Sequence, residues 1–210
     1  MIYTISIQEG EISKCLIIQK KLSEIKLGQK TSIDVDASNK NIVLAGGCFW
    51  GTEEFLRRLP GVINTYTAYA NGNTLSPTYE DVCSGETLHA EAVYVEYNPE
   101  IIDLAHLLYY FFKSFDPREL DKQGNDFGKQ YRNGIYYLDE EDLDTINFVV
   151  EMIQEKYQEP LATEVLPLDN LSKAEEFHQD YLIKNPLGYC HVDFRNLPDA
   201  GASMKGDKFE

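Results

Sequence analysis

The chain has 210 residues, and its 35 acidic and 19 basic side chains give a formal net charge of −16 at pH 7. This charge repels the phosphates of nucleic acids and of anionic lipids, so we expect neither a nucleic-acid-binding protein nor a membrane-surface protein. The hydrophobic share of 43% and the charged share of 26% are ordinary for a globular protein with one large domain.

The cysteines point to free thiols. They stand at positions 15, 48, 83 and 190, without CxxC spacing and without the ligand spacing of a zinc site, so we expect no metal. The first residues lack the basic start and the apolar core of a secretory signal, which favours the cytoplasm. A disulfide framework is the weaker interpretation for such a chain, and we expect one or two thiols to be chemically active.

The N-terminal third contains the first clear strand and helix signals. Residues 1–40 hold a short alternating strand and a polar run, and we interpret them as an extension packed on the main domain. The apolar run at 42–45 predicts a buried strand. Two glycines end this strand, and a helix pattern follows that stops at the Pro-Gly pair 60–61. Residues 62–70 predict a second strand, which ends at an Asn-Gly turn signal.

The middle of the chain alternates between strands and helices. The stretch 73–90 is rich in loop residues, with a short helix expected after Thr78, and the polar stretch 115–133 is too long for a simple connector. The regular elements predicted beyond residue 90 are a strand at 92–97, a helix at 101–112, a strand at 135–138, a helix at 139–158 and a strand at 163–166.

Near the C-terminus a helix is predicted over 172–184, because Ser172 fits the N-cap and Glu175 completes a capping box. From residue 185 the pattern is irregular, and residues 198–210 are expected to be a flexible tail. The alternation of strands and helices predicts a mixed α+β fold. We expect a two-layer sandwich in which helices flank a mixed central sheet, with long ordered loops and an irregular C-terminal tail.

The segment GGCFWG at 46–51 carries the strongest chemical signal. Its order of strand, glycine break, cysteine and helix places Cys48 at or near a helix N-terminus. Unpaired N–H groups and the helix dipole stabilise a thiolate there, which predicts a lowered pKa. The alternative is that Cys48 is a small buried hydrophobe. Phe49 and Trp50 are then core residues instead of the walls of a small apolar pocket around the sulfur.

Five blocks of sequence, in order, resemble the A-type peptide methionine sulfoxide reductases. They are GCFWGTE at 47–53, YANG at 69–72 with PTY at 77–79, VCSG at 82–85 with HAEAV at 89–93, QGNDFGKQYR at 123–132, and AEEFHQDYL at 174–182 with NPLGYC at 185–190. The resemblance covers roughly residues 41–195 and implies a catalytic domain over 41–197. Five ordered blocks are far more specific than one.

The resemblance implies thiol-dependent reduction of the S-epimer of methionine sulfoxide, free or in peptides and proteins, as repair of oxidative damage. A thiolate attacks the sulfoxide sulfur while an acid protonates the oxygen, which releases methionine and leaves a cysteine sulfenic acid. The matching positions make Cys48 the nucleophile and Glu91 the acid. To hold a proton at pH 7, Glu91 needs a pKa raised from about 4.3 to about 6–7 by an apolar site. The alternative is an exposed carboxylate on a strand.

Other positions match residues that bind the substrate. Tyr79 and Tyr131 match hydroxyls that hydrogen-bond the sulfoxide oxygen, although either tyrosine alone would more often serve packing. Phe49 and Trp50 match the walls that hold the ε-methyl group. Asp126 matches a residue that contacts the substrate amide or orients a tyrosine, and the alternative for an Asn-Asp pair in such a loop is turn chemistry.

The remaining cysteines and histidines receive different roles. Cys190 matches the recycling cysteine, so the resemblance implies a Cys48–Cys190 disulfide that thioredoxin or a similar dithiol donor reduces. We interpret Cys83 as a buried spacer and His178 as a structural hydrogen-bond donor. His89 is a candidate support for the catalytic acid.

Three positions depart from the family pattern. Leu88 and Asn71 stand where glycine is usual, and Phe115 stands where histidine is usual. We expect a monomer without metal or organic cofactor, whose partners are peptides or proteins that contain methionine sulfoxide and a thioredoxin-like reductant. Two rival functions are a sulfoxide-binding protein without turnover and a Cys/His metal module. The retained catalytic set argues against the first, and the ligand spacing argues against the second.

Overall fold

The computed structural model describes residues 39–206 and 208–209. The predicted extension over residues 1–40 lies outside this part of the chain, apart from its last two residues, and so does Cys15. Within the described ranges, no helix combines the length and the apolar character that a membrane span requires.

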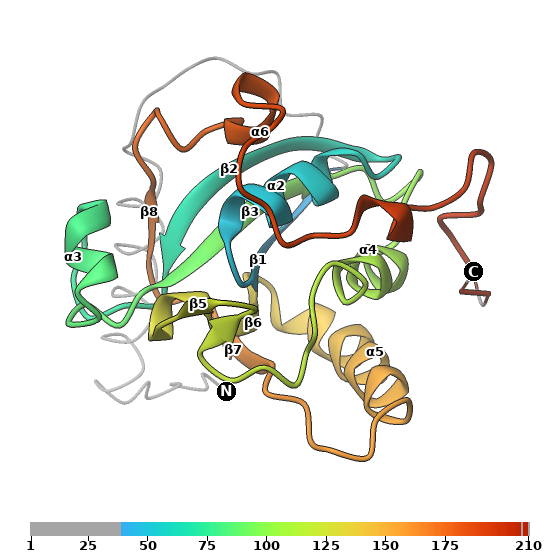
Figure 1. Cartoon of the computed structure of the whole chain (residues 1–210). Helices are drawn as coiled ribbons and strands as arrows, with labels where there is room; N and C mark the ends of the chain where they lie inside the picture. Colours follow the sequence, from blue (N-terminus) through green and yellow to red (C-terminus); the bar gives the residue numbers. More distant parts are fainter. Residues whose placement is uncertain (1–38, 207, 210) are drawn as a thin grey trace, which may run out of the picture. The chain divides into compact units, whose positions relative to one another are not determined.

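A mixed sheet of six strands forms the centre of the described chain, in the order β7-β6-β1-β3-β2-β8 (Figure 1). Neighbouring strands are antiparallel except β6 and β7, which are parallel. The strands are β1 (Lys40–Gly46), β2 (Val62–Ala70), β3 (Ala90–Tyr97), β6 (Asn133–Tyr137), β7 (Glu164–Pro167) and β8 (Leu171–Lys173). A separate short ribbon pairs β4 (Lys122–Gln123) with β5 (Asp126–Phe127).

The helices are short. The α-helices are α2 (Phe49–Arg57), α3 (Tyr79–Cys83), α4 (Leu104–Phe111), α5 (Leu143–Gln154) and α6 (Tyr181–Lys184), and the 3₁₀ turns are η1 (Lys129–Tyr131), η2 (Glu140–Asp142) and η3 (Phe194–Asn196). The α2 helix packs on the sheet, and α4 contacts α2 and α5 and shares the core with side chains of β1 (Figure 1). This is the mixed α+β arrangement that the sequence predicted.

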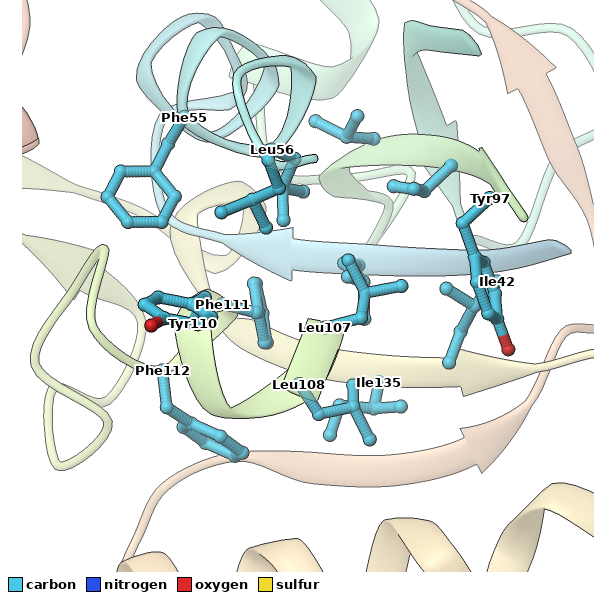
Figure 2. Close-up of a cluster of buried hydrophobic side chains, with 14 of the residues drawn as sticks. Ile42, Phe55, Leu56, Tyr97, Leu107, Leu108, Tyr110, Phe111, Phe112 and Ile135 are labelled. Atoms are coloured by element: carbon cyan, nitrogen blue, oxygen red, sulfur yellow. The ribbon is translucent and has the colours of Figure 1, made fainter. Parts of the chain in front are cut away.

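The central strand β1 is buried on both faces, which explains its continuous apolar run. Because side chains alternate along a strand, Ile42 and Leu44 enter the larger core together with side chains of α2 and α4 (Figure 2). Val43 and Ala45 enter a smaller cluster with Tyr136. Two packed faces hold β1 in place, and with it the turn that follows.

The antiparallel pairing of β1 with β3 brings two distant segments together. The end of β1 lies beside the beginning of β3, since Leu44 is paired with Val93. The chain leaves β1 at Gly46 and reaches Cys48 two residues later, while Glu91 is the second residue of β3. The sheet topology therefore places the predicted nucleophile and the predicted acid at the same end of two adjacent strands.

The helix predicted over 172–184 is wrong. Ser172 lies in β8 and pairs with Tyr69 of β2, and the only α-helix in this stretch of the described chain is α6. The Glu175 carboxylate accepts a hydrogen bond from the Tyr69 hydroxyl (2.7 Å) and another from the Tyr79 backbone N–H (2.8 Å). A local capping pattern was overruled by tertiary pairing at the edge of the sheet.

Two other helix boundaries moved for local reasons. The Asp103 side chain accepts the N–H of His106 at 2.9 Å, so it caps α4 and delays the start of that helix to Leu104. The stretch predicted as one helix over 139–158 is divided into η2 and α5, and α5 ends at Gln154.

The segment predicted as a flexible tail, 198–210, contacts the start of α4. Met204 is 5% exposed, and its carbonyl accepts the N–H of Asp103 at 3.1 Å. The Nε2 atom of His106 lies 3.0 Å from the carbonyl oxygen of Lys208. These contacts join the end of the described chain to the main core.

Candidate active site

Cys48 occupies the N-cap of α2, at the position that the sequence predicted. Its side chain is buried, and the nearby N–H groups of Trp50 and Gly51 in the first turn act to lower the pKa of the thiol. Its own N–H donates to Oε1 of Gln123 at 2.9 Å, and Nε2 of Gln123 donates to the Gly46 carbonyl at 3.1 Å. The Gln123 amide therefore clamps both sides of the turn that carries the nucleophile.

Gly47 makes this turn sterically feasible. Its φ is +82°, in the left-handed region, and a Cβ there would lie 2.5 Å from the Gln123 side chain. The glycine break in the motif thus serves both the backbone conformation and the approach of the clamping amide.

Glu91 lies beside this turn and is 1% exposed. Its Oε2 accepts the N–H of Phe49 at 3.2 Å, so the carboxyl lies next to the residue that follows Cys48. Burial raises the pKa of Glu91 to about 8. The carboxyl is therefore mostly protonated at pH 7, as an acid in this position requires. The alternative of an exposed carboxylate is wrong.

The predicted lowering of the Cys48 pKa is also wrong. Burial and the nearby Glu91 charge raise the pKa of the Cys48 thiol to about 12. The N–H groups of Trp50 and Gly51 pull the pKa down, but their effect is smaller. Helix-terminal stabilisation is present as expected, and desolvation outweighs it because the thiol is enclosed.

Tyr79 and Tyr131 reach the same site from two different elements, the start of α3 and the end of η1. Burial is the main cause that raises the pKa of both phenols, and the Glu91 charge contributes to both. Both hydroxyls therefore keep their protons and can donate hydrogen bonds near the carboxyl. The structure brings these two predicted residues together with Cys48 and Glu91.

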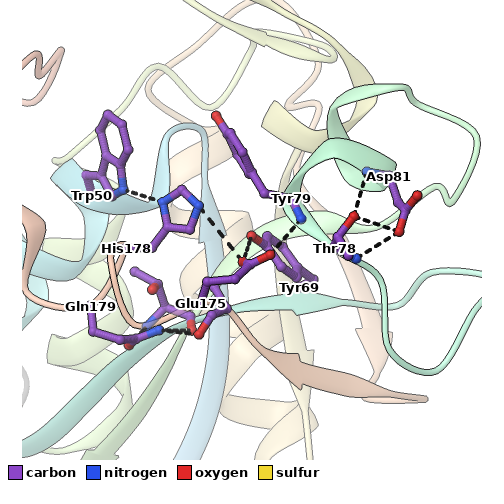
Figure 3. Close-up of polar contacts among 10 residues, drawn as sticks. Trp50, Tyr69, Thr78, Tyr79, Asp81, Glu175, His178 and Gln179 are labelled. Carbon is purple, nitrogen blue, oxygen red and sulfur yellow. Dashed lines mark hydrogen bonds and ion pairs between the residues drawn. The ribbon is translucent and has the colours of Figure 1, made fainter.

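Phe49 and Trp50 form an aromatic wall at the start of α2. Phe49 is fully buried, whereas the Trp50 ring stacks on Tyr181 of α6 at 3.7 Å between centroids. The Trp50 Nε1–H donates to Nδ1 of His178 at 3.0 Å (Figure 3). His178 is therefore an acceptor for Trp50 instead of the donor that the sequence suggested, and its ring also packs against Phe49 at 4.9 Å.

Glu175 connects this aromatic wall to the tyrosines. Its Oε2 lies 4.0 Å from Nε2 of His178 and accepts the Tyr69 hydroxyl at 2.7 Å, and its Oε1 accepts the Tyr79 N–H at 2.8 Å (Figure 3). One carboxylate thus fixes residues from β2, α3 and the 174–179 segment around the site.

Asp126 faces the segment that carries Cys190. Its two carboxylate oxygens lie 3.3 Å from the Tyr189 hydroxyl and 3.1 Å from Nε2 of His191. The sulfur of Cys190 lies against Gly51, because a Cβ on that glycine would come within 2.9 Å of it. Both predicted residues therefore belong to the region around the first turn of α2.

Two further expectations need correction or refinement. Cys83 is exposed and hydrogen-bonds Tyr79, so it is not a buried spacer. His89 is buried against Gly72, where a Cβ would lie 2.1 Å from its Nδ1. This close approach requires glycine at 72.

The departures from the family pattern have a backbone signature. Leu88 has φ +56° and Asn71 has φ +50°, both in the left-handed region. Asparagine tolerates this conformation, whereas a leucine there is strained. Leu88 lies three residues before Glu91, so the strain is stored in the loop that leads into the acid.

Several residues of the site received no role in this site from the sequence analysis. They are Gln123, Glu175, Tyr181, Tyr189 and His191. The first four lie inside the blocks that carry the family resemblance, and that was the signal that could have identified them. His191 follows the last block directly. Among the described residues, no group of three or more His, Cys, Asp or Glu side chains is arranged to hold a metal ion.

Comparisons with known proteins give the same family as the sequence resemblance. The family model described as peptide methionine sulfoxide reductase matches residues 40–207. The peptide methionine sulfoxide reductase MsrA of Clostridium perfringens (strain 13 / Type A) is 55% identical over 153 residues, which cover 73% of this chain and 98% of that protein.

Solved structures are also similar. The reduced form of Mxr1 from Saccharomyces cerevisiae is 40% identical with a TM-score of 0.72, and the match covers 78% of this chain and 95% of that chain. Mxr1 in complex with Trx2 is 31% identical with a TM-score of 0.52, and the match covers 72% and 91%.

Proposed function

The chain belongs to the peptide methionine sulfoxide reductase family, and we propose that it reduces the S-epimer of methionine sulfoxide, free or in peptides and proteins, with Cys48 as the nucleophile. The observation that carries this proposal is the buried carboxyl of Glu91, which binds the Phe49 N–H beside Cys48 and whose pKa is raised to about 8 by burial. A sulfur nucleophile and a protonated acid thus lie side by side.

The shape of the site supports selectivity for one epimer. The ring of Trp50, which is partly exposed and stacks with the buried ring of Phe49, offers an apolar surface for the methyl group on the sulfoxide sulfur. The proton donors are the carboxyl of Glu91 and the hydroxyls of Tyr79 and Tyr131, which lie near one another, and we propose that the sulfoxide oxygen points to them. When the rest of the substrate points to solvent, only one configuration at sulfur places the methyl group on the wall and the oxygen near the donors.

The reaction follows from these positions. The Cys48 sulfur attacks the sulfoxide sulfur as a thiolate while Glu91 donates its proton to the oxygen, and the proton that the Cys48 thiol gives up replaces the one lost by Glu91. The hydroxyl then passes from the substrate sulfur to the Cys48 sulfur. The sulfur–oxygen bond of the substrate and the transient bond between the two sulfurs break, methionine leaves, and Cys48 becomes a sulfenic acid. Methionine sulfoxide is reduced by two electrons and Cys48 is oxidised by two. The negative charge of ionised Glu91 is one cause of the raised pKa of Cys48. Protonation removes this charge, so protonated Glu91 favours the Cys48 thiolate.

Recycling is proposed to use Cys190. Its sulfur attacks the sulfenic sulfur, the S–S bond forms, and the hydroxyl takes up the proton of the Cys190 thiol and leaves as water. A thioredoxin-like dithiol then reduces the disulfide, and the complex of Mxr1 with Trx2 supports this class of partner. We propose that the enzyme acts as a monomer on oxidised methionine in the cytoplasm, a reducing compartment that suits the free thiols of the described chain.

Separated epimers of N-acetyl methionine sulfoxide test this function. With dithiothreitol as reductant, we expect release of N-acetyl methionine from the S-epimer and at least about 100-fold slower release from the R-epimer. Binding of the S-epimer without any product would favour a binding protein, and equal rates for both epimers would contradict the proposed orientation.

A further inference from the structure

The segment 189–192 touches two separate parts of the molecule. On one side, Cys190 and Val192 lie against Gly51 in the first turn of α2. On the other side, Tyr189 and His191 meet Asp126 of the β4–β5 ribbon. The segment is therefore held between helix α2 and the β4–β5 ribbon, although it has no regular secondary structure.

Gly51 is an unusual choice inside a helix, where alanine is the better helix former. A Cβ at this position would lie 2.6 Å from Cγ2 of Val192 and 2.9 Å from Sγ of Cys190. Contacts this short cannot be kept, so the segment has to move if Gly51 gains a side chain. The Gly51 N–H also lies near enough to the Cys48 thiol to act on its pKa, so this one residue borders both sulfurs.

A hydrogen-bonded group holds the other side of the segment. Nε2 of His191 lies 2.6 Å from the Tyr189 hydroxyl and 3.1 Å from Oδ2 of Asp126, and the Tyr189 hydroxyl donates to Oδ1 of Asp126 at 3.3 Å. A Cβ on Gly124 would lie 3.0 Å from the His191 ring. The two side chains that flank Cys190 therefore bind one carboxylate on the ribbon.

We propose that Gly51 and His191 are positioning residues for the recycling step, which hold Cys190 close to Cys48 before the sulfenic acid forms. The missing side chain at Gly51 provides the place where Cys190 rests, and His191 fixes the segment to Asp126. This inference rests on the proposed role of Cys190. It predicts that changes at either residue slow formation of the Cys48–Cys190 disulfide more than they slow release of methionine.

The test compares two rates in the same enzyme. In a single turnover, released methionine and remaining free thiols are measured over time in wild type, Gly51→Ala, Val192→Ala and Gly51→Ala/Val192→Ala. We expect Gly51→Ala to lower the rate of disulfide formation, relative to methionine release, at least about 10-fold. Val192→Ala alone should leave this ratio near wild type. The double variant should regain part of the loss, because the methyl groups in conflict with the new Cβ are gone.

His191→Ala keeps the inference testable if Gly51→Ala does not fold, and it should lower the same ratio about 3- to 10-fold. Wild-type ratios in the folded Gly51→Ala or in His191→Ala would overturn the positioning role. Cys190→Ser separates this failure from failure of the proposed function. If Cys190→Ser recycles normally with thioredoxin, the role of Cys190 is wrong. If it stalls while the Gly51 and His191 variants do not, only the positioning role is wrong.

Discussion

Cys48 lies where a buried strand passes into a helix, whereas Cys190 lies in a segment without regular secondary structure. Backbone groups and the Gln123 amide fix Cys48. Cys190 is half-buried and is held by neighbouring side chains, among them Tyr189, which is 51% exposed. The reacting atoms need rigid elements, because their geometry must be kept within fractions of an ångström. The recycling thiol needs only to reach the sulfur after the chemical step, which an irregular segment permits.

The largest effect is expected at the rigid region. Cys48→Ser should abolish methionine release, because an alcohol at neutral pH is a far poorer nucleophile than a thiolate. The matched control is Cys83→Ser, in which the exposed thiol is replaced and activity should stay close to wild type. Product formation from the S-epimer measures both. Residual wild-type activity in Cys48→Ser would mean that another group reacts with the sulfoxide.

Glu91→Gln should slow the chemical step at least about 100-fold, the lower end of general-acid effects. Glutamine keeps an oxygen that can accept the Phe49 N–H but has no acidic proton to give. Rapid-quench measurement of methionine release in a single turnover reports this step alone, because the recycling reaction is not needed for the first turnover. A loss below about 10-fold would show that the tyrosine hydroxyls suffice as proton donors.

The same variant should be more stable than wild type at neutral pH. The folded-state pKa of Glu91 is about 8, against an ordinary 4.5 in the unfolded chain. Between these values the unfolded chain loses the proton and the folded chain keeps it, so wild-type stability falls as pH rises from 4.5 to 8. Glu91→Gln removes this loss and should gain about 3 kcal/mol at pH 7 and almost nothing at pH 4. Urea unfolding at both pH values measures the difference, and an equal gain at both would refute the raised pKa.

The smallest effect is expected in the loop before the acid. Leu88→Gly should stabilise the protein by less than about 1 kcal/mol, because relief of the left-handed strain exceeds the entropy cost of glycine only slightly. Gly85→Ala is the control. Gly85 also has a left-handed φ and open space around it, so alanine there should destabilise by about 1 kcal/mol. If the urea midpoints of the two variants shift by similar amounts in opposite directions, backbone strain is the cause, because a Cβ at Gly85 has no packed neighbours. A clear loss of stability in Leu88→Gly would contradict the account.

The sequence was sufficient wherever the signal was local. Glycine breaks and apolar runs located β1, the turn at Cys48 and the start of α2, and the family blocks located the two tyrosines of the site. The helix expected from the Ser172 and Glu175 pattern failed because those residues pair with β2 and with Tyr69. The short-range pattern carries no information about that partner.

Two features of the site depend on the folded state. The pKa of Cys48 is set by burial and by the charge of Glu91. Glu91 is held there by the N–H of Phe49, a residue 42 positions away in the sequence. The contact between Asp126 and Tyr189 joins residues 63 positions apart. No spacing rule predicts either feature, because both arise only after the sheet and the C-terminal segment have packed.

The separation of the two regions is tested most directly by single-turnover product release in Cys190→Ser. If the rigid region performs the chemistry alone, this variant should release one methionine per enzyme at the wild-type rate. It should then stall with thioredoxin and resume with dithiothreitol, a small thiol that can reduce the sulfenic acid itself. A first turnover that is lost or slowed more than about 10-fold would contradict the account, because Cys190 would then take part in the reduction of the sulfoxide.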